Sequence, residues 1–167
     1  MGLGAAWHSR TGASAGTIGS AITNAVFGGS SDASGSAVSD PITQGNDSIS
    51  RYFVIRFTAD GTGSNTASNI LIKRSDSTGS GANIDGLGTV IHAKAGEAYS
   101  QNSTTALTGG TDLQASGANS EALTAPAAIT GTNTGDSQEF AVQVQTGASA
   151  NAGQNFTLQC TFDVTVA

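Results

Sequence analysis

The sequence predicts an all-β protein: an antiparallel, jelly-roll-like β-sandwich with an extended N-terminal arm. Apolar and polar residues alternate in several segments, which is typical of strands with one buried face. Stretches rich in Gly, Ser and Asn separate these segments and supply turn residues. No segment has the apolar spacing of a convincing amphipathic helix, so these observations favour a sandwich over an α/β fold.

The composition indicates a surface of hydroxyl and amide groups with few charges. Ser, Thr, Ala and Gly fill 91 of the 167 positions, and charged residues make up 11 %, against roughly 25 % in an ordinary soluble domain. The formal net charge of −6 opposes binding to nucleic acid, where basic groups must replace the counterions of phosphates, and to anionic membranes. We therefore expect neither nucleic acid nor a membrane as a partner.

Residues 1–48 are rich in Gly, Ser and Ala, and they are predicted to form a low-complexity arm outside a sandwich domain of residues 49–167. Residues 16–29 carry apolar side chains at helical spacing, but Gly19 and the β-branched residues weaken a helix, so we expect either a short helix or a strand. An arm with so little apolar surface would gain order along a neighbouring subunit. Its larger apolar residues are the candidate assembly contacts: Trp7, Ile18, Ile22, Val26 and Phe27.

The first firm strand is "RYFVIRFT", which begins at Arg51. Phe53, Ile55 and Phe57 share one face of this strand, because side chains alternate across the pleat. Tyr52 shares the other face with Val54. We therefore expect that second face to be at least partly covered too.

Residues 60–135 form the middle of the predicted sandwich. The polar turn of residues 60–65 leads to a strand at 68–74, and a Gly- and Ser-rich tract leads to another at 89–95. Residues 96–135 hold only isolated apolar positions, which predicts short strands and long loops.

Residues 138–146 alternate again, with Phe140, Val142 and Val144 on one face. A Gly- and Ala-rich connection then leads to the last segment, and an antiparallel hairpin is the simplest arrangement for the two.

The last segment, residues 155–167, has the clearest pattern, with an apolar side chain at every even position from 156 to 166. Burial contributes roughly 1.5 to 3 kcal/mol for each such side chain, so this strand is expected to lie at the centre of the core. The predicted core consists of Phe53, Ile55, Phe57, Phe140, Val142, Val144, Phe156, Leu158, Cys160, Phe162, Val164 and Val166.

No motif supports catalysis. "GASAG" at residues 12–16 matches the G-x-S-x-G nucleophile elbow, but the strand before it, the helix after it and the His and acid partners are missing. His8, His92 and Cys160 lack zinc-ligand spacing; we interpret His92 as a strand-surface residue and Cys160 as a buried free thiol. We expect no enzymatic activity, no catalytic residues and no cofactor.

Two oxygen-rich loops, at residues 60–65 and 75–86, raise the question of calcium. Neither follows the EF-hand pattern, and turn chemistry accounts for their aspartates. No metal site is expected.

The N-terminus begins "MGLGAAWHSR", without the basic start and apolar run of a signal peptide. A single cysteine excludes an internal disulfide. Both features lead us to expect a protein that is made in the cytoplasm and stays unprocessed.

Residues 21–76 resemble a pattern in structural proteins of tailed-bacteriophage virions. The pattern consists of the short apolar segment "AITNAVFGG", a polar lead-in, "SRYFVIRFT", a polar turn and a partner strand bearing "NILI". The resemblance implies a virion component, such as a capsid decoration (cement) protein or another surface subunit. It implies a homo-oligomer that also contacts other virion proteins, such as a major capsid protein, and that is assembled in the host cytoplasm.

A secreted filament (pilus-like) or surface-layer subunit is the alternative. Such an extracellular subunit would use its arm to add a strand to the sheet of the next subunit. A carbohydrate-binding sandwich is disfavoured, because one Trp and two Tyr supply few aromatic platforms for sugars.

Overall fold

The computed structural model describes residues 2–12, 17–32, 38, 40–61, 63–75, 88–114, 118–150 and 156–167. Strands are the only regular elements in these ranges, so no described helix could cross a membrane. The strands are β1 (Leu3–Thr11), β2 (Thr17–Ile22), β3 (Arg51–Ala59), β4 (Ser64–Arg74), β5 (Val90–Ala95), β6 (Thr111–Leu113), β7 (Ser120–Leu123), β8 (Ile129–Thr130), β9 (Thr134–Asp136), β10 (Phe140–Gln145) and β11 (Leu158–Val166).

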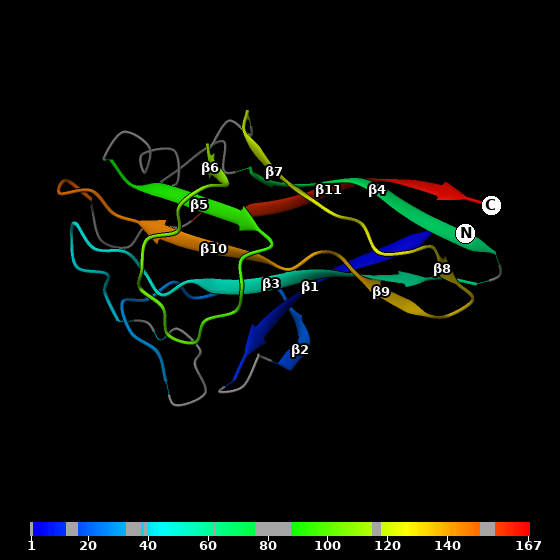
Figure 1. Cartoon of the computed structure of the whole chain (residues 1–167), viewed down its shortest axis with the longest axis horizontal. Coiled ribbons are helices and arrows are strands. Elements are labelled where there is room, and N and C mark those ends of the chain that lie inside the picture. The colour runs from blue at the N-terminus through cyan, green and yellow to red at the C-terminus, as the bar shows by residue number, and fades with distance from the viewer. Residues whose placement is uncertain are drawn as a thin grey trace.

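The strands form two antiparallel sheets, which confirms the predicted β-sandwich (Figure 1). The large sheet has the order β2-β1-β3-β10-β5-β6, and β9 continues the edge of β3 beyond β10. The small sheet has the order β11-β4-β7, with β8 on the same side of β4 as β7.

The chain crosses from the large sheet to the small sheet at two similar places, between β3 and β4 and between β10 and β11. β3 and β10 are neighbours in the large sheet, while the strands that follow them, β4 and β11, are neighbours in the small sheet. The expected hairpin between residues 138–146 and the terminal strand is therefore wrong. Both strands keep their apolar faces toward the shared core, but they contribute these faces from opposite layers.

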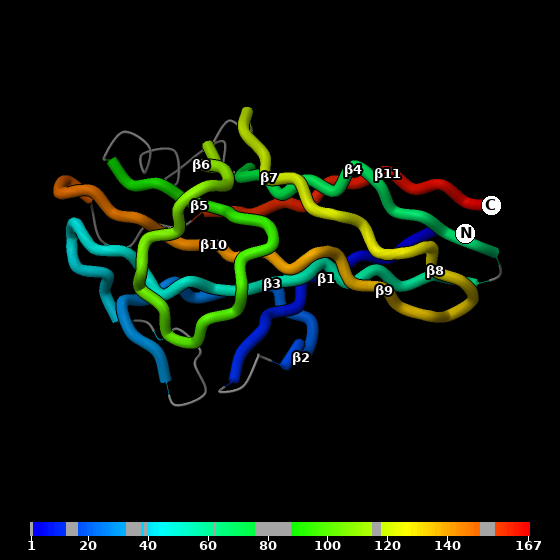
Figure 2. Tube along the Cα trace, viewed as in Figure 1, coloured from blue at the N-terminus to red at the C-terminus, as the bar shows by residue number. Residues whose placement is uncertain are grey.

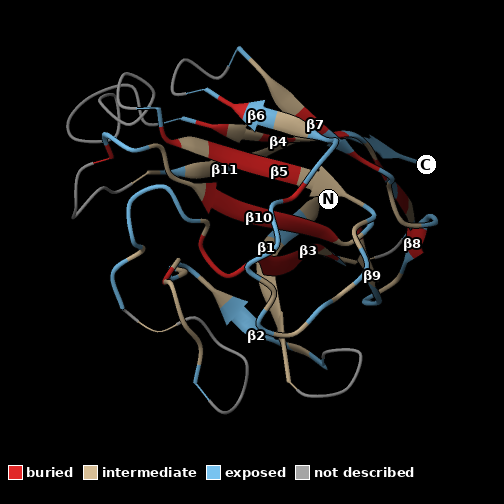
Figure 3. Ribbon diagram, turned by 60° about the vertical axis from the view of Figure 1, so that its left-hand side comes forward, coloured by how far each residue is buried: buried red, intermediate tan, exposed pale blue. Residues whose placement is uncertain are grey.

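The core lies between the layers and is richest on β3 and β10 (Figure 3). Phe53, Ile55 and Phe57 are at most 1 % exposed, as are Phe140 and Val142. They face the small sheet, where Ile70 and Ile72 of β4 are equally buried. Val144 also belongs to this buried cluster.

The outer face of the large sheet is covered by residues 96–110, which we call the strap. Figure 2 shows this loop passing across β10 and β3. The ring of Tyr99 packs against that of Tyr52 at 4.9 Å between centroids, and Leu107 belongs to the same small cluster. The expectation that the second face of β3 is covered is thus confirmed.

Gln143 ties the strap to the sheet. This side chain is fully buried, although the alternating pattern predicts that it faces outward. Its Oε1 accepts the Leu107 backbone N–H at 2.8 Å, and its Nε2 donates to the carbonyls of Ser48 and Thr105 at 2.9 and 3.1 Å. Every polar atom of the amide therefore has a protein partner, as a buried polar group requires.

Gln143→Ala should lower the free energy of unfolding by about 3 kcal/mol, because it leaves a cavity and three unpaired backbone groups. Urea unfolding measures this loss. Gln159→Ala, at an exposed site on β11, is the control and should change stability by less than about 0.5 kcal/mol. Equal stabilities for the two variants would show that the strap is not held by Gln143.

The extended N-terminal arm is not confirmed. β1 pairs with β3 along its length, from Leu3 opposite Ala59 to Arg10 opposite Tyr52. β2 then pairs with β1. These residues form the edge of the large sheet, and the expected separation at residue 48 does not divide the hydrogen-bonded sheet.

Residues 16–29 were expected to contain a short helix or a strand. Strand β2 occupies residues 17–22 of this segment. The pairing register shifts within β2, because two residues lie between Ile18 and Ala21 while only one lies between their partners on β1. Ile22 consequently lies opposite Trp7, whereas Ile18 lies opposite Arg10 on the other face. Without this bulge, two residues four positions apart would share one face of the strand.

The terminal strand is not central. β11 is the last strand of the small sheet and pairs only with β4 among the described residues. Val164 and Val166 are 40 % and 45 % exposed, so their assignment to the core is wrong. The other four predicted core residues of this segment are only partly buried: Phe156, Leu158, Cys160 and Phe162. Period-two alternation identifies the face that points inward, but it does not show whether another layer covers that face.

Phe140→Ala should lower the free energy of unfolding by about 3 to 5 kcal/mol. The partly buried Phe162, changed to Ala, should cost about half as much, because less of its surface leaves water on folding. Thermal and urea unfolding of the two variants test the ranking. A larger loss for Phe162→Ala would restore β11 to the centre of the core.

Candidate functional site

One flank of the sandwich is closed by the chain itself. β8 pairs with β4 in the small sheet, and after a short turn β9 pairs with β3 in the large sheet. The Arg56 guanidinium holds the Asp136 carboxylate through two bonds of 2.7 Å, which fixes β9 against β3. This crossing covers the gap between the layers along that side.

The opposite flank has no such crossing among the described residues. The ring of Phe162 on β11 meets Phe57 on β3 at 5.0 Å, so β11 lies over β3. At the other side of the small sheet, β7 lies against β5 and β6. β1 and β2 therefore extend beyond the small sheet, and we call the exposed edges of β1, β2 and β11 the open flank.

An apolar groove of about 1400 Å³ begins at this flank. Its walls come from β1, the segment after β2, residues 40–44 and the start of β11. The groove is lined by apolar side chains, chiefly Trp7, Ile22, Val26, Phe27, Ile42, Phe53, Ile91, Val144, Phe156 and Leu158. Phe53 and Ile91 are at most 1 % exposed, so water reaches the mouth of the groove and not its inner wall.

Four of the five expected assembly contacts line the groove, but two of them are engaged by the protein's own core. Trp7 makes edge-on contacts with Phe53 and Phe140 at 5.9 and 5.6 Å. Phe27 packs on Phe156 at 5.2 Å. Val26, in contrast, is 46 % exposed at the mouth. Ile18 lies on the outer face of the sheet and does not line the groove.

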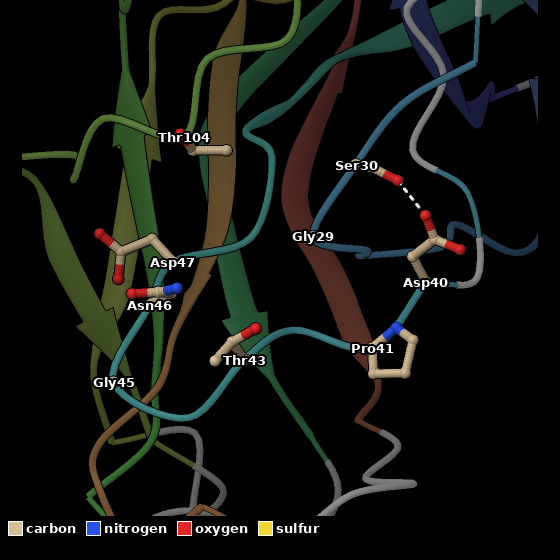
Figure 4. Close-up of a pocket in the computed structure, with 9 residues that line it drawn as sticks. All are labelled: Gly29, Ser30, Asp40, Pro41, Thr43, Gly45, Asn46, Asp47 and Thr104. Atoms are coloured by element: carbon tan, nitrogen blue, oxygen red, sulfur yellow. Dashed lines mark hydrogen bonds between the residues drawn. The ribbon is translucent and has the colours of Figure 1, made fainter.

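A second, polar pocket of about 570 Å³ lies between residues 29–30, 40–47 and Thr104 (Figure 4). The Ser30 hydroxyl donates to the Asp40 carboxylate, and Figure 4 shows the Asp47 side chain on the far side of the pocket. Burial raises the pKa of Asp47. No described residues gather three metal-ligating side chains here or elsewhere.

The two histidines hold backbone in place. His92 is 8 % exposed, so the strand-surface interpretation is wrong. Its Nδ1 lies 2.5 Å from Asp112 Oδ1 and its Nε2 lies 2.6 Å from the Gly109 carbonyl, which fixes β6 beside β5. His8 Nδ1 lies 2.7 Å from the Gly19 carbonyl, at the bulge of β2.

An ion pair beneath the strap was not predicted. The Arg10 guanidinium binds the Glu139 carboxylate and lies 5.9 Å from the centroid of Tyr99. Burial raises the pKa of Glu139, and the charge of Arg10 opposes that shift. The Tyr99 hydroxyl donates to the Gly12 carbonyl at 2.8 Å. The cluster joins β1 to the strap. Because Arg10 and Glu139 are 129 residues apart in the sequence, no local pattern could have predicted that they form a pair.

Two sequence motifs lie wholly or partly outside the described residues. They are the "GASAG" match beyond Gly12 and the oxygen-rich loop after Ser75. The turn at residues 60–65 joins β3 to β4 across the two layers.

Cys160 lies on the inward side of β11 and is half-buried. Burial raises the pKa of its thiol from 9.0 to about 11. Since the thiolate is the reactive form, this cysteine is a poor nucleophile at neutral pH.

Alkylation of Cys160 by iodoacetamide at about pH 8 should be about 100-fold slower in the folded protein than in urea, because a pKa near 11 reduces the thiolate fraction. Mass spectrometry of timed samples gives both rates. Comparable rates would mean that β11 opens readily or that the thiol is not shielded.

Comparison with known proteins finds no matching family model, no similar curated protein and no similar solved structure.

Proposed function

We propose that this chain is a non-enzymatic structural subunit of a virus particle, a capsid decoration (cement) protein or another surface subunit of a tailed bacteriophage. The open flank is the observation that carries the proposal. Among the described residues, the three large apolar side chains that are most exposed are Val26 at the groove mouth and Val164 and Val166 on β11. Val164 and Val166 lie together at the end of β11, and exposed apolar side chains that cluster in this way mark an interaction site.

The charge distribution supports assembly with copies of the same chain and with neighbours such as a major capsid protein. β1 carries no charge from Leu3 to Trp7, and β2 carries none at all. β11 carries one, Asp163, whose carboxylate accepts a bond of 2.6 Å from Asn69 Nδ2. A chain of net charge −6 can therefore bring this flank against another copy with only one carboxylate from β11 of each copy, that of Asp163, near the contact.

The second edge of β11 supports the alternative, an extracellular filament or surface-layer subunit. β11 has nine residues and pairs with β4 along one edge. Among the described residues no strand lies along its other edge, so another subunit could add a strand there. In that case the added strand would come from a neighbour and not from residues 1–48 of a free arm, because β1 and β2 already pair within the sheet.

Electron microscopy of the purified full chain separates the two proposals. Closed oligomers are expected for the virion subunit, and open filaments for the alternative. Particles banded from the source on a density gradient should then yield peptides of this chain by mass spectrometry. Their absence from intact particles would overturn the virion proposal.

A further inference from the structure

We infer that the open flank is the surface through which two copies of this chain associate. The inference rests on the proposed structural function and specifies the interface that such a subunit would use. It depends on the position of β11 over β3, with β1 and β2 beyond it.

The two flanks of the sandwich differ in how far they are covered. On the opposite flank, the β8–β9 crossing shields the apolar side chains between the layers from solvent. On the open flank, Ala5 of β1 is exposed, and Val164 and Val166 lie on the inward side of β11 yet remain 40 % and 45 % exposed. These side chains belong to the two layers and border the same gap.

The geometry of the edge restricts how a second copy can approach. Strands within a sheet lie about 4.8 Å apart. If β11 of one copy paired with β11 of another at that spacing, with their apolar faces on the same side, β1 of each copy would occupy the position of β3 of the other copy. The two flanks of two whole sandwiches therefore meet by packing of side chains, because the overhanging strands prevent β11 of one copy from pairing with β11 of the other.

The size of the flank fits a second copy. β11 has nine residues, which span about 30 Å at about 3.3 Å per residue, and two layers about 10 Å apart give a height of about 15 Å. Two such flanks bury on the order of 1000 Å² together, the lower limit for a specific interface. The near absence of charge on the flank, in a chain of net charge −6, favours a copy of the same surface over a basic partner.

Val164→Lys/Val166→Lys tests the interface. Thr66→Lys/Ala122→Lys is the matched control, because Thr66 and Ala122 are exposed residues of β4 and β7 in the same sheet. Both variants change the net charge by the same amount, so only the position of the lysines differs. Sedimentation velocity over a range of concentrations gives the dissociation constant, and circular dichroism gives the melting temperature.

Wild type and control should associate, while Val164→Lys/Val166→Lys should raise the dissociation constant at least about tenfold, because lysines would be desolvated at the interface. If that variant fails to fold, Val166→Lys alone serves the same purpose, with Thr66→Lys as its control. Unchanged association in a folded flank variant, or a wild type that stays monomeric at about 1 mM, would overturn the inference. A monomeric wild type that binds a different virion protein would also overturn it. The proposed function is judged separately, by the presence of the chain in purified particles.

Discussion

Strand β3 is the element on which the rest of the structure depends. Its backbone pairs with β1 along one edge and with β10 and then β9 along the other. Its inner side chains face the small sheet, and its outer ones lie under the strap. A strand that is paired on both edges and covered on both faces carries apolar residues on both faces, as β3 does from Tyr52 to Ile55. The position of each neighbouring element follows from its contacts with this strand.

The two layers are unequal in width, and that inequality separates the closed flank from the open one. The large sheet gains β1 and β2 at one end, and the small sheet has no strand opposite them. A further strand beside β11 would lie opposite β1 and bury Val164 and Val166. No described strand occupies that position, and the two valines remain exposed there. Trp7 packs against the core even so, because the pairing of β1 with β3 places its indole beside Phe53 and Phe140.

Much of the fold could be predicted from local pattern, and the errors share one cause. Alternation correctly located the strands around Phe53, Ile70, Ile91 and Phe140, and it correctly gave the inward side of β11. It could not show that β11 lies at an edge, because exposure depends on a second layer far away in the sequence. It also could not show that Gln143, on the opposite face from Val142 and Val144, is buried, because the strap that covers it has no periodicity of its own. For β1, the low content of large apolar residues suggested an arm, whereas the sheet needs only Leu3 and Trp7 there for inward contacts.

The candidate site was harder to predict for the same reason. Val26 and Trp7 were identified as contacts from their size and position, but only the structure distinguishes the exposed valine from the packed tryptophan. The ion pair of Arg10 and Glu139 and the contact of His92 with Asp112 join residues that are distant in sequence. No spacing rule applies to such pairs, since tertiary pairing alone brings them together.

The pairing of β11 with β4 also has a consequence for synthesis. β4 ends at Arg74, whereas its partner on one edge is β11, from Leu158 to Val166. On the ribosome, this edge of β4 stays without its partner until more than eighty further residues have been made. An unpaired strand edge that carries Ile70 and Ile72 favours association with other chains. A nascent chain therefore remains prone to aggregate through this edge until residues 158–166 have left the exit tunnel.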